Sequence, residues 1–130
     1  MKNNLKIALA QLNPIVGDVK GNIIKLIDIR NNLKDEVDII VAPELYVTGY
    51  PIDDLVLRND FLELVENEIN ILAKITNDGK AAIVLGAPRK EKNSIRNSVF
   101  VLDDGKITSF RDKHNLPNSG VFDEQRIFFP

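Results

Sequence analysis

Residues 37–52, with the sequence VDIIVAPELYVTGYPI, decide the fold of this chain. The stretch opens with the apolar, β-branched residues Val37, Ile39, Ile40 and Val41, a run of strand length that predicts a strand buried on both faces. Pro43 ends the run, and Glu44 is the first charged side chain beyond it. In open α/β domains, chemistry collects in the loops past the carboxyl ends of strands. Glu44 is therefore a candidate general base, although a turn cap or a solvent-exposed carboxylate explains the same position equally well.

The residues before this stretch predict a strand and a helix. Residues 6–12, KIALAQL, alternate as a strand does, and the small alanines of one face indicate that something packs closely over them. Residues 19–33 carry apolar side chains at helical spacing, and Asp18 is placed to cap that helix. Together with residues 37–41, they predict a strand–helix–strand crossover between parallel strands.

The residues after this stretch predict a second helix and a third strand. Residues 61–75 have an apolar stripe of helical period, with Asp60 as the expected N-cap. Residues 81–87, AAIVLGA, predict another buried strand that Pro88 ends, and residues 89–94 read as a basic, solvated loop.

A hairpin is predicted near the middle of the second half of the chain. Residues 97–102 and 106–110 alternate around Asp104-Gly105, and an Asp-Gly pair between two such runs is a strong hairpin signal. Residues 111–130 are predicted to be irregular, with Phe122, Phe128 and Phe129 as anchors. The pattern alone leaves open a predominantly parallel α/β sheet, but the hairpin favours a mixed one.

Composition excludes several classes of function. The 130 residues fit one domain, and 17 basic against 19 acidic residues leave no basic footprint for a nucleic acid. No apolar run is long enough to span a membrane, and the start of the sequence lacks the apolar stretch of a signal peptide, so we expect a cytoplasmic protein. The chain has no cysteine and a single histidine, His114, so we expect no metal site and no cysteine nucleophile within it.

A second constellation lies at residues 110–117, FRDKHNLP. Lys113 follows the predicted hairpin, where a chain bends off a sheet and a side chain can reach into a cleft. Taken alone, Lys113 is best read as a solvated lysine. Paired with Glu44 beyond another strand, it becomes half of a charged dyad, because a lysine and a carboxylate tolerate burial far better together than apart.

Three separated blocks of the sequence resemble the carbon–nitrogen hydrolase, or nitrilase, superfamily. They are IALAQLNPIVGD (residues 7–18), APELYVTGYPIDDL (residues 42–55) and KHNLPNSGVFDEQRIF (residues 113–128). Within the superfamily they are most similar to the glutamine amidotransferase domain of glutamine-dependent NAD synthetases. The three blocks occur in the family's order and extend over nearly the whole chain.

The resemblance implies a fold and a set of roles. It implies an α/β chain, the first half of a nitrilase-type αββα sandwich, in which a mixed sheet carries helices on its outer face. Residues 1–130 would then form one incomplete domain. The family uses a Glu–Lys–Cys triad, in which Glu44 matches the general base and Lys113 the residue that supports the oxyanion. The cysteine lies further along such chains, and we expect substrate-binding roles for Tyr50, Ser119, Phe122 and Glu124.

The sequence departs from the family pattern at Ser119, and it contains no counterpart of the ATP-binding synthetase domain. Ser119 stands where the family usually has a tyrosine, which puts its substrate-binding role in doubt. Nothing resembles an ATP-binding synthetase domain, so we expect no cofactor here, and ATP and magnesium only in a separate synthetase domain. The implied partners are glutamine, that domain or a cysteine-bearing chain, and further copies in a homo-oligomer. The alternatives are a non-catalytic half-domain completed by a partner, or the remnant of a decayed gene.

Overall fold

The computed structural model describes residues 3–130, so the first two residues of the polar N-terminal stretch lie outside it. Its centre is one five-stranded sheet, whose strands follow each other in space in the order of the sequence. The first three strands are parallel and the last three antiparallel. The strands are β1 (Ile7–Leu9), β2 (Ile39–Val41), β3 (Ala82–Glu91), β4 (Ser94–Asp103) and β5 (Lys106–Asp112).

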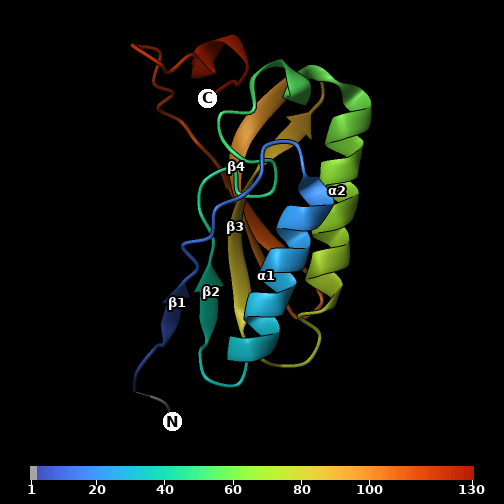
Figure 1. Cartoon of the computed structure of the whole chain (residues 1–130), viewed down its shortest axis with the longest axis vertical. Helices are drawn as coiled ribbons and strands as arrows, with labels where there is room; N and C mark the ends of the chain where they lie inside the picture. The colour runs from blue at the N-terminus through green and yellow to red at the C-terminus, as the bar shows by residue number, and fades with distance from the viewer. Residues whose placement is uncertain (1–2) are drawn as a thin grey trace.

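Two helices lie side by side on one face of this sheet (Figure 1). They are α1 (Val19–Leu33) and α2 (Asn59–Lys74), and two short 3-10 turns, η1 (Asp53–Leu57) and η2 (Glu124–Arg126), complete the elements. Within residues 3–130, neither helix combines the length and the apolar character that a membrane span requires. The mixed sheet with helices on one face confirms the predicted fold class and rules out the predominantly parallel alternative.

The helices follow the sequence pattern, with one difference. Helix α1 has the predicted bounds, and the Asp18 carboxylate caps it by accepting the N–H of Gly21 at 3.1 Å. Helix α2 begins before Asp60, so the prediction that Asp60 is its N-cap is wrong. Asp60 lies in the first turn, where its carboxylate pairs with the exposed Arg58. A negative charge at this end of a helix also interacts favourably with the helix dipole. The apolar stripe is buried as predicted: Phe61, Leu62, Val65, Ile69 and Leu72.

Strand β3 is longer than predicted, because Pro88 does not end it. Pro88 pairs with Asn97 inside the β3–β4 ladder, and the strand continues to Glu91. Strand β2 accompanies β3 only as far as Val84, so beyond that point one side of β3 has no neighbouring strand. A proline, which has no N–H, can be accommodated at such an edge. The predicted basic loop at residues 89–94 is thus the end of β3 and a tight turn into β4.

The predicted hairpin is present between β4 and β5. Asp104 and Gly105 both have positive φ, 52° and 77°, as a two-residue hairpin turn requires. The segment after β5 is irregular as predicted, but only one of its three expected anchors is buried. Phe128 is 3% exposed, whereas Phe122 and Phe129 remain about half exposed, at 42% and 56%.

The face of the sheet opposite the helices is apolar and uncovered. Ile40 of β2 is fully buried beneath the helices, but its neighbours Ile39 and Val41 point the other way and are only half-buried. On the same open face, Leu9 is 70% exposed and Val99 39% exposed. The prediction that β2 is buried on both faces is therefore wrong for the described chain. The open face is where a sandwich would place its second sheet.

Arg30 ties α1 to the strand and loop beneath it. Its guanidinium is 1% exposed and bonds the carboxylate of Asp78 at 2.7 and 3.0 Å. It also donates to the carbonyl oxygens of Ala81 and Ile75. The hydrogen bond from Arg30 holds the pKa of Asp78 well below its usual range. Because the folded pKa is lowered, this contribution to stability is complete above the unfolded value of about 3.9 and is lost as the pH falls through the folded pKa.

We predict that Arg30→Met lowers the free energy of unfolding by about 3 kcal/mol at pH 7, because it leaves a carboxylate and two carbonyls without their donor. The difference from the unmodified chain should shrink as the pH falls below about 4, since the unfolded chains then take up a proton at Asp78 that the folded unmodified chain, with its lowered pKa, does not. Urea unfolding at several pH values measures both effects. Lys80→Met, which removes an exposed ion pair with Asp35, is the control and should change the stability far less.

Candidate functional site

A sharp bend places Glu44 directly over strand β3. Leu45, the next residue, has a φ of 51°, an uncommon conformation for a branched residue. The bend rests on Gly86: a Cβ built there would lie 2.4 Å from the amide nitrogen of Leu45 and 2.8 Å from the Cα of Glu44. Only glycine leaves room for backbone so close to a strand. The carbonyl of Gly86 also accepts the N–H of Val47 at 3.2 Å, which holds the far side of the bend.

Buried polar contacts fasten the rest of this loop to α1. The hydroxyl of Tyr46 donates to the carbonyl of Asn22 at 2.7 Å, and the Asn22 amide donates to the carbonyl of Val47 at 3.1 Å. Both side chains are fully buried, and burial raises the pKa of Tyr46 to about 12. Satisfied polar groups in a core define one arrangement of the chain. The side chain of Glu44 therefore extends from a loop that β3 holds on one side and α1 on the other.

We predict that Gly86→Ala moves Glu44 away from its place and costs about 1–3 kcal/mol of stability, because the added methyl group overlaps backbone that is tied to α1. A crystal structure and a thermal melt measure the two effects. Gly79→Ala is the control, since its Cβ meets nothing within 4 Å and only its φ of 69° is strained. That variant should lose about 1–2 kcal/mol without moving Glu44, and a Gly86→Ala structure with an unmoved Glu44 would contradict the prediction.

Lys113 lies at the end of β5, where neighbouring strands hold the backbone. Its N–H donates to the carbonyl of Asn97 on β4 at 2.7 Å. The preceding residue, Asp112, accepts from Ser98 at 2.6 Å and forms a bidentate pair with Arg89 of β3 at 2.7 and 3.2 Å. Strands β3 and β4 together fix the point from which the Lys113 side chain leaves the sheet.

Lys113 reaches two carboxylates that come from distant parts of the chain. Its Nζ lies 2.7 Å from Oε1 of Glu44, and 3.1 Å from Oε2 and 3.3 Å from Oε1 of Glu124. Glu124 is 4% exposed, whereas the side chain of Glu44 is half exposed. The hydroxyl of Tyr50 donates to Glu124 at 3.3 Å. The structure thus brings together four of the predicted site residues, and we call Glu44, Lys113 and Glu124 the charged trio.

The charged trio keeps its lysine protonated. Burial acts to lower the pKa of Lys113, but hydrogen bonds and the charges of Glu44 and Glu124 outweigh it and raise that pKa above the usual lysine value. Burial, followed by the charge and hydrogen bond of Glu124, raises the pKa of Tyr50. The site therefore presents a fixed positive charge and a solvent-facing carboxylate, the two groups that an acyl transfer needs besides a nucleophile.

We predict that Glu44→Gln lowers the pKa of Lys113, because the ammonium loses an anionic neighbour while its partial burial remains. Titration of the lysine Nζ by nitrogen-15 NMR measures the change. Glu91→Gln is the matched control, since Glu91 pairs with Arg89 and Arg96 and not with Lys113. Equal Lys113 titration in the Glu44→Gln and unmodified chains would show that the ion pair does not persist in solution.

Two predicted substrate-binding residues lie apart from this group. Ser119 and Phe122 are exposed, and the Ser119 carbonyl accepts the N–H of Phe122 at 3.0 Å in a turn. Within residues 3–130, no hydrogen bond joins either residue to the charged trio. Their substrate-binding roles stay predictions.

The sequence reasoning missed Asn97, which is 3% exposed and donates from Nδ2 to Oε1 of Glu44 at 2.7 Å. An available signal was its polarity within the alternating β4 run. A buried asparagine in a strand must find a hydrogen-bond partner, and the nearest charged loop supplies it.

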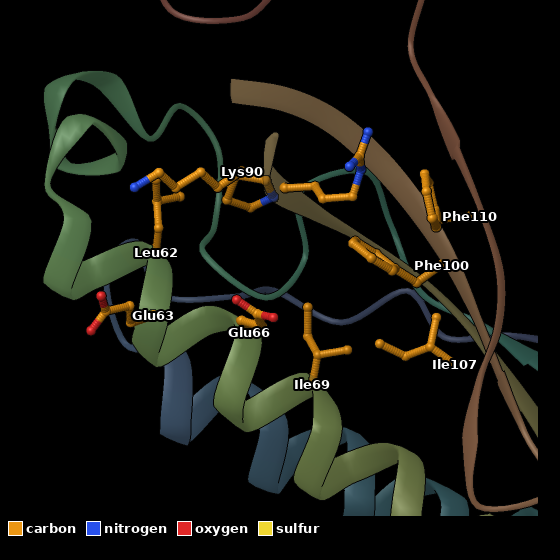
Figure 2. A pocket seen from close by; sticks show the side chains of 10 residues that line it. Leu62, Glu63, Glu66, Ile69, Lys90, Phe100, Ile107 and Phe110 are labelled. Carbon is orange, nitrogen blue, oxygen red and sulfur yellow. The ribbon is translucent and has the colours of Figure 1, made fainter. Parts of the chain in front are cut away.

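Two hollows of similar size lie on opposite faces of the sheet. One, of 290 Å³, opens between α2 and strands β3 to β5 (Figure 2). Its floor is the ring pair of Phe100 and Phe110 with Ile69 and Ile107, and its Arg89 stacks over Phe110 at 4.3 Å. The other, of 310 Å³, lies on the open face, and Glu44, Asn97 and Lys113 line it. The second hollow differs from the first in holding a carboxylate and an ammonium in direct contact, with Glu44 and Lys113 2.7 Å apart. Within residues 3–130, no three His, Asp or Glu side chains could hold a metal ion.

Comparison with known proteins places the chain in a family. The profile of the family described as carbon-nitrogen hydrolase matches residues 6–130. The chain belongs to the carbon–nitrogen hydrolase family. Among the curated relatives, a glutamine-dependent NAD(+) synthetase of Thermotoga maritima is 38% identical over 127 residues, which cover 97% of this chain and 22% of that protein. The synthetase of Acinetobacter baylyi is 36% identical over 129 residues, or 98% of this chain and 23% of that protein.

Solved structures give the same result for the fold. The glutamine-dependent NAD+ synthetase of Acinetobacter baumannii matches with a TM-score of 0.86 at 36% identity, over 96% of this chain and 24% of that one. An amidase from Nesterenkonia sp. matches with a TM-score of 0.80 at 18% identity, over 97% of this chain and 48% of that one. The predicted family and fold are confirmed. The chain spans less than a quarter of the length of these synthetases.

Proposed function

We propose that this chain is the N-terminal part of the glutaminase domain of a glutamine-dependent NAD synthetase, and that it contributes two of three catalytic groups. The observation that carries the proposal is the 2.7 Å contact between the Lys113 ammonium and Glu44 on the rim of the open face. The similarity to synthetases from several bacteria supports glutamine as the substrate.

In this proposal each group has a step of its own. A cysteine thiol gives its proton to Glu44 as the thiolate attacks the amide carbon of glutamine. Glu44 returns the proton to the leaving nitrogen, which departs as ammonia, and water then cleaves the thioester to give glutamate. The ammonium of Lys113 has three N–H donors. Glu44 and Glu124 occupy two of them, so one remains for the developing oxyanion.

The nucleophile comes from residues other than these 130, because the chain contains no cysteine. Glu124 holds Lys113 from its buried side, and Tyr50 in turn holds Glu124. The released ammonia would amidate the deamido-NAD precursor in a separate synthetase domain, where we place ATP and magnesium. A cytoplasmic homo-oligomer is part of the same proposal.

A second candidate function is that of a non-catalytic half-domain completed by a partner chain. The uncovered apolar face, with Ile7, Leu9 and Val99 exposed, favours it, because large exposed apolar surfaces mark interaction sites. A cysteine-bearing chain that copurifies with this one would unite the two candidates, whereas a cysteine-free partner would support the second alone.

We predict that the isolated 130-residue chain hydrolyses no glutamine, because loss of the nucleophile removes almost all of the rate even when its partners remain. Ammonia release in a coupled assay measures this, with Lys113→Ala as the control. Turnover clearly above that control would contradict the prediction.

The proposal itself is tested by supplying a cysteine-bearing remainder of the domain, joined to the chain or added to it. Glutamine hydrolysis should appear, and Glu44→Gln or Lys113→Ala should each lower it by on the order of a thousandfold or more. Hydrolysis that survives Glu44→Gln would overturn the assignment of the base.

A further inference from the structure

Asn97 is a single buried residue that contacts the two less buried members of the charged trio, Glu44 and Lys113. Its side-chain Nδ2 donates to Oε1 of Glu44 at 2.7 Å. Its backbone carbonyl accepts the N–H of Lys113, also at 2.7 Å. The two charged residues come from different loops, and β4 passes between them with Asn97 facing the hollow that they line.

The Glu44 carboxylate is bound through one oxygen only. Oε1 accepts from both Lys113 and Asn97, and no residue among 3–130 donates to Oε2. The side chain of Glu44 is 51% exposed, and an exposed ion pair by itself contributes little and leaves a carboxylate free to turn. A second donor, held rigidly in a sheet, removes that freedom, and a hydrogen bond to a carboxylate is among the stronger ones.

We propose that Asn97 is a positioning residue that fixes Oε1 of Glu44 against Lys113 and so leaves Oε2 as the oxygen that exchanges protons with the nucleophile. The second half of this statement rests on the proposed function; the first concerns only the geometry of the charged trio. A neutral amide suits the position, because it holds the carboxylate without adding a charge that would compete with Lys113 for the oxyanion.

A simpler explanation is that Asn97 only stabilises the sheet. It is buried, and a buried amide that finds a partner is ordinary. The two explanations differ in what happens to Lys113. If Asn97 only stabilises the sheet, its replacement lowers the thermal midpoint and leaves the ion pair intact. If it positions Glu44, its replacement also loosens the contact between Glu44 and Lys113.

The test is the titration of the Lys113 ammonium, by nitrogen-15 NMR, in variants of the 130-residue chain. Glu44, Glu124 and the Tyr50 hydroxyl are the titratable groups around it. Asn97→Leu should lower the pKa of Lys113, because Glu44 is released from it. Asn97→Asp, which keeps the size of the side chain, should raise that pKa, because it adds a carboxylate beside the ammonium. Asn93→Asp, in the exposed β3–β4 turn, adds the same charge to the same hairpin and should change nothing.

Opposite shifts in the two Asn97 variants support the proposal. A lowered thermal midpoint with an unchanged Lys113 titration in Asn97→Leu overturns it. If Asn97→Leu does not fold, Asn97→Ser decides instead, because its short neutral side chain lacks the amide that reaches Glu44: an unchanged Lys113 titration overturns the proposal.

A second measurement separates this proposal from the function. In a glutaminase completed by a cysteine-bearing remainder, Asn97→Leu should lower kcat by about 10- to 100-fold, the worth of one hydrogen bond to a charged group, and leave KM unchanged. An active wild-type assembly whose kcat is indifferent to Asn97→Leu overturns the catalytic half. Shifts of Lys113 as expected, without glutamine hydrolysis by any assembly, would support the positioning role and reject the glutaminase.

Discussion

The packing of the Glu44–Leu45 backbone on Gly86 is the constraint on which the rest of the site depends. Because β3 has no side chain at this point, the chain leaving β2 can cross it within van der Waals distance. That crossing turns Glu44 toward the end of β5, and the hydrogen bonds of Tyr46 and Asn22 keep it there. A bulkier residue on β3 would move the carboxylate by more than the tolerance of a hydrogen bond, since backbone and not a flexible side chain would have to yield.

The charges around Lys113 hold the site together. One ammonium lies between a buried carboxylate, Glu124, and a half-exposed one, Glu44. The buried carboxylate needs the ammonium, because an unpaired charge is costly to bury. The exposed carboxylate does not, and so remains available for chemistry. Lys113 thus serves as the structural counter-ion of the buried Glu124. At the same time it lies next to Glu44, the carboxylate that remains free to react.

Sequence reasoning identified the elements that depend on local patterns. The helix at Val19–Leu33, its Asp18 cap and the turn at Asp104-Gly105 follow from residues within one turn of each other. It failed where a distant neighbour decides: Pro88 lies inside a strand because β2 ends early, and Ile39 and Val41 are half exposed because nothing packs on that face. The positions of Glu44 and Lys113 past two strands suggested a charged dyad, but only the family resemblance assigned it, since no spacing along the chain shows that residues 69 positions apart meet. The sequence analysis did not identify Asn97, because its role depends on a contact with Glu44, which is distant in the sequence.

The open apolar face has a consequence for how the site becomes active. Val41, Val84 and Val99 of that face line the same hollow as Glu44 and Lys113. A layer that covers these valines also covers the Glu44–Lys113 ion pair, so water is removed from the apolar face and from the ion pair together. Removal of water strengthens every electrostatic interaction at the carboxylate and the ammonium. Under the proposed function, assembly and activation form a single transition, which is driven by hydrophobic burial and which strengthens the interaction of the two charges.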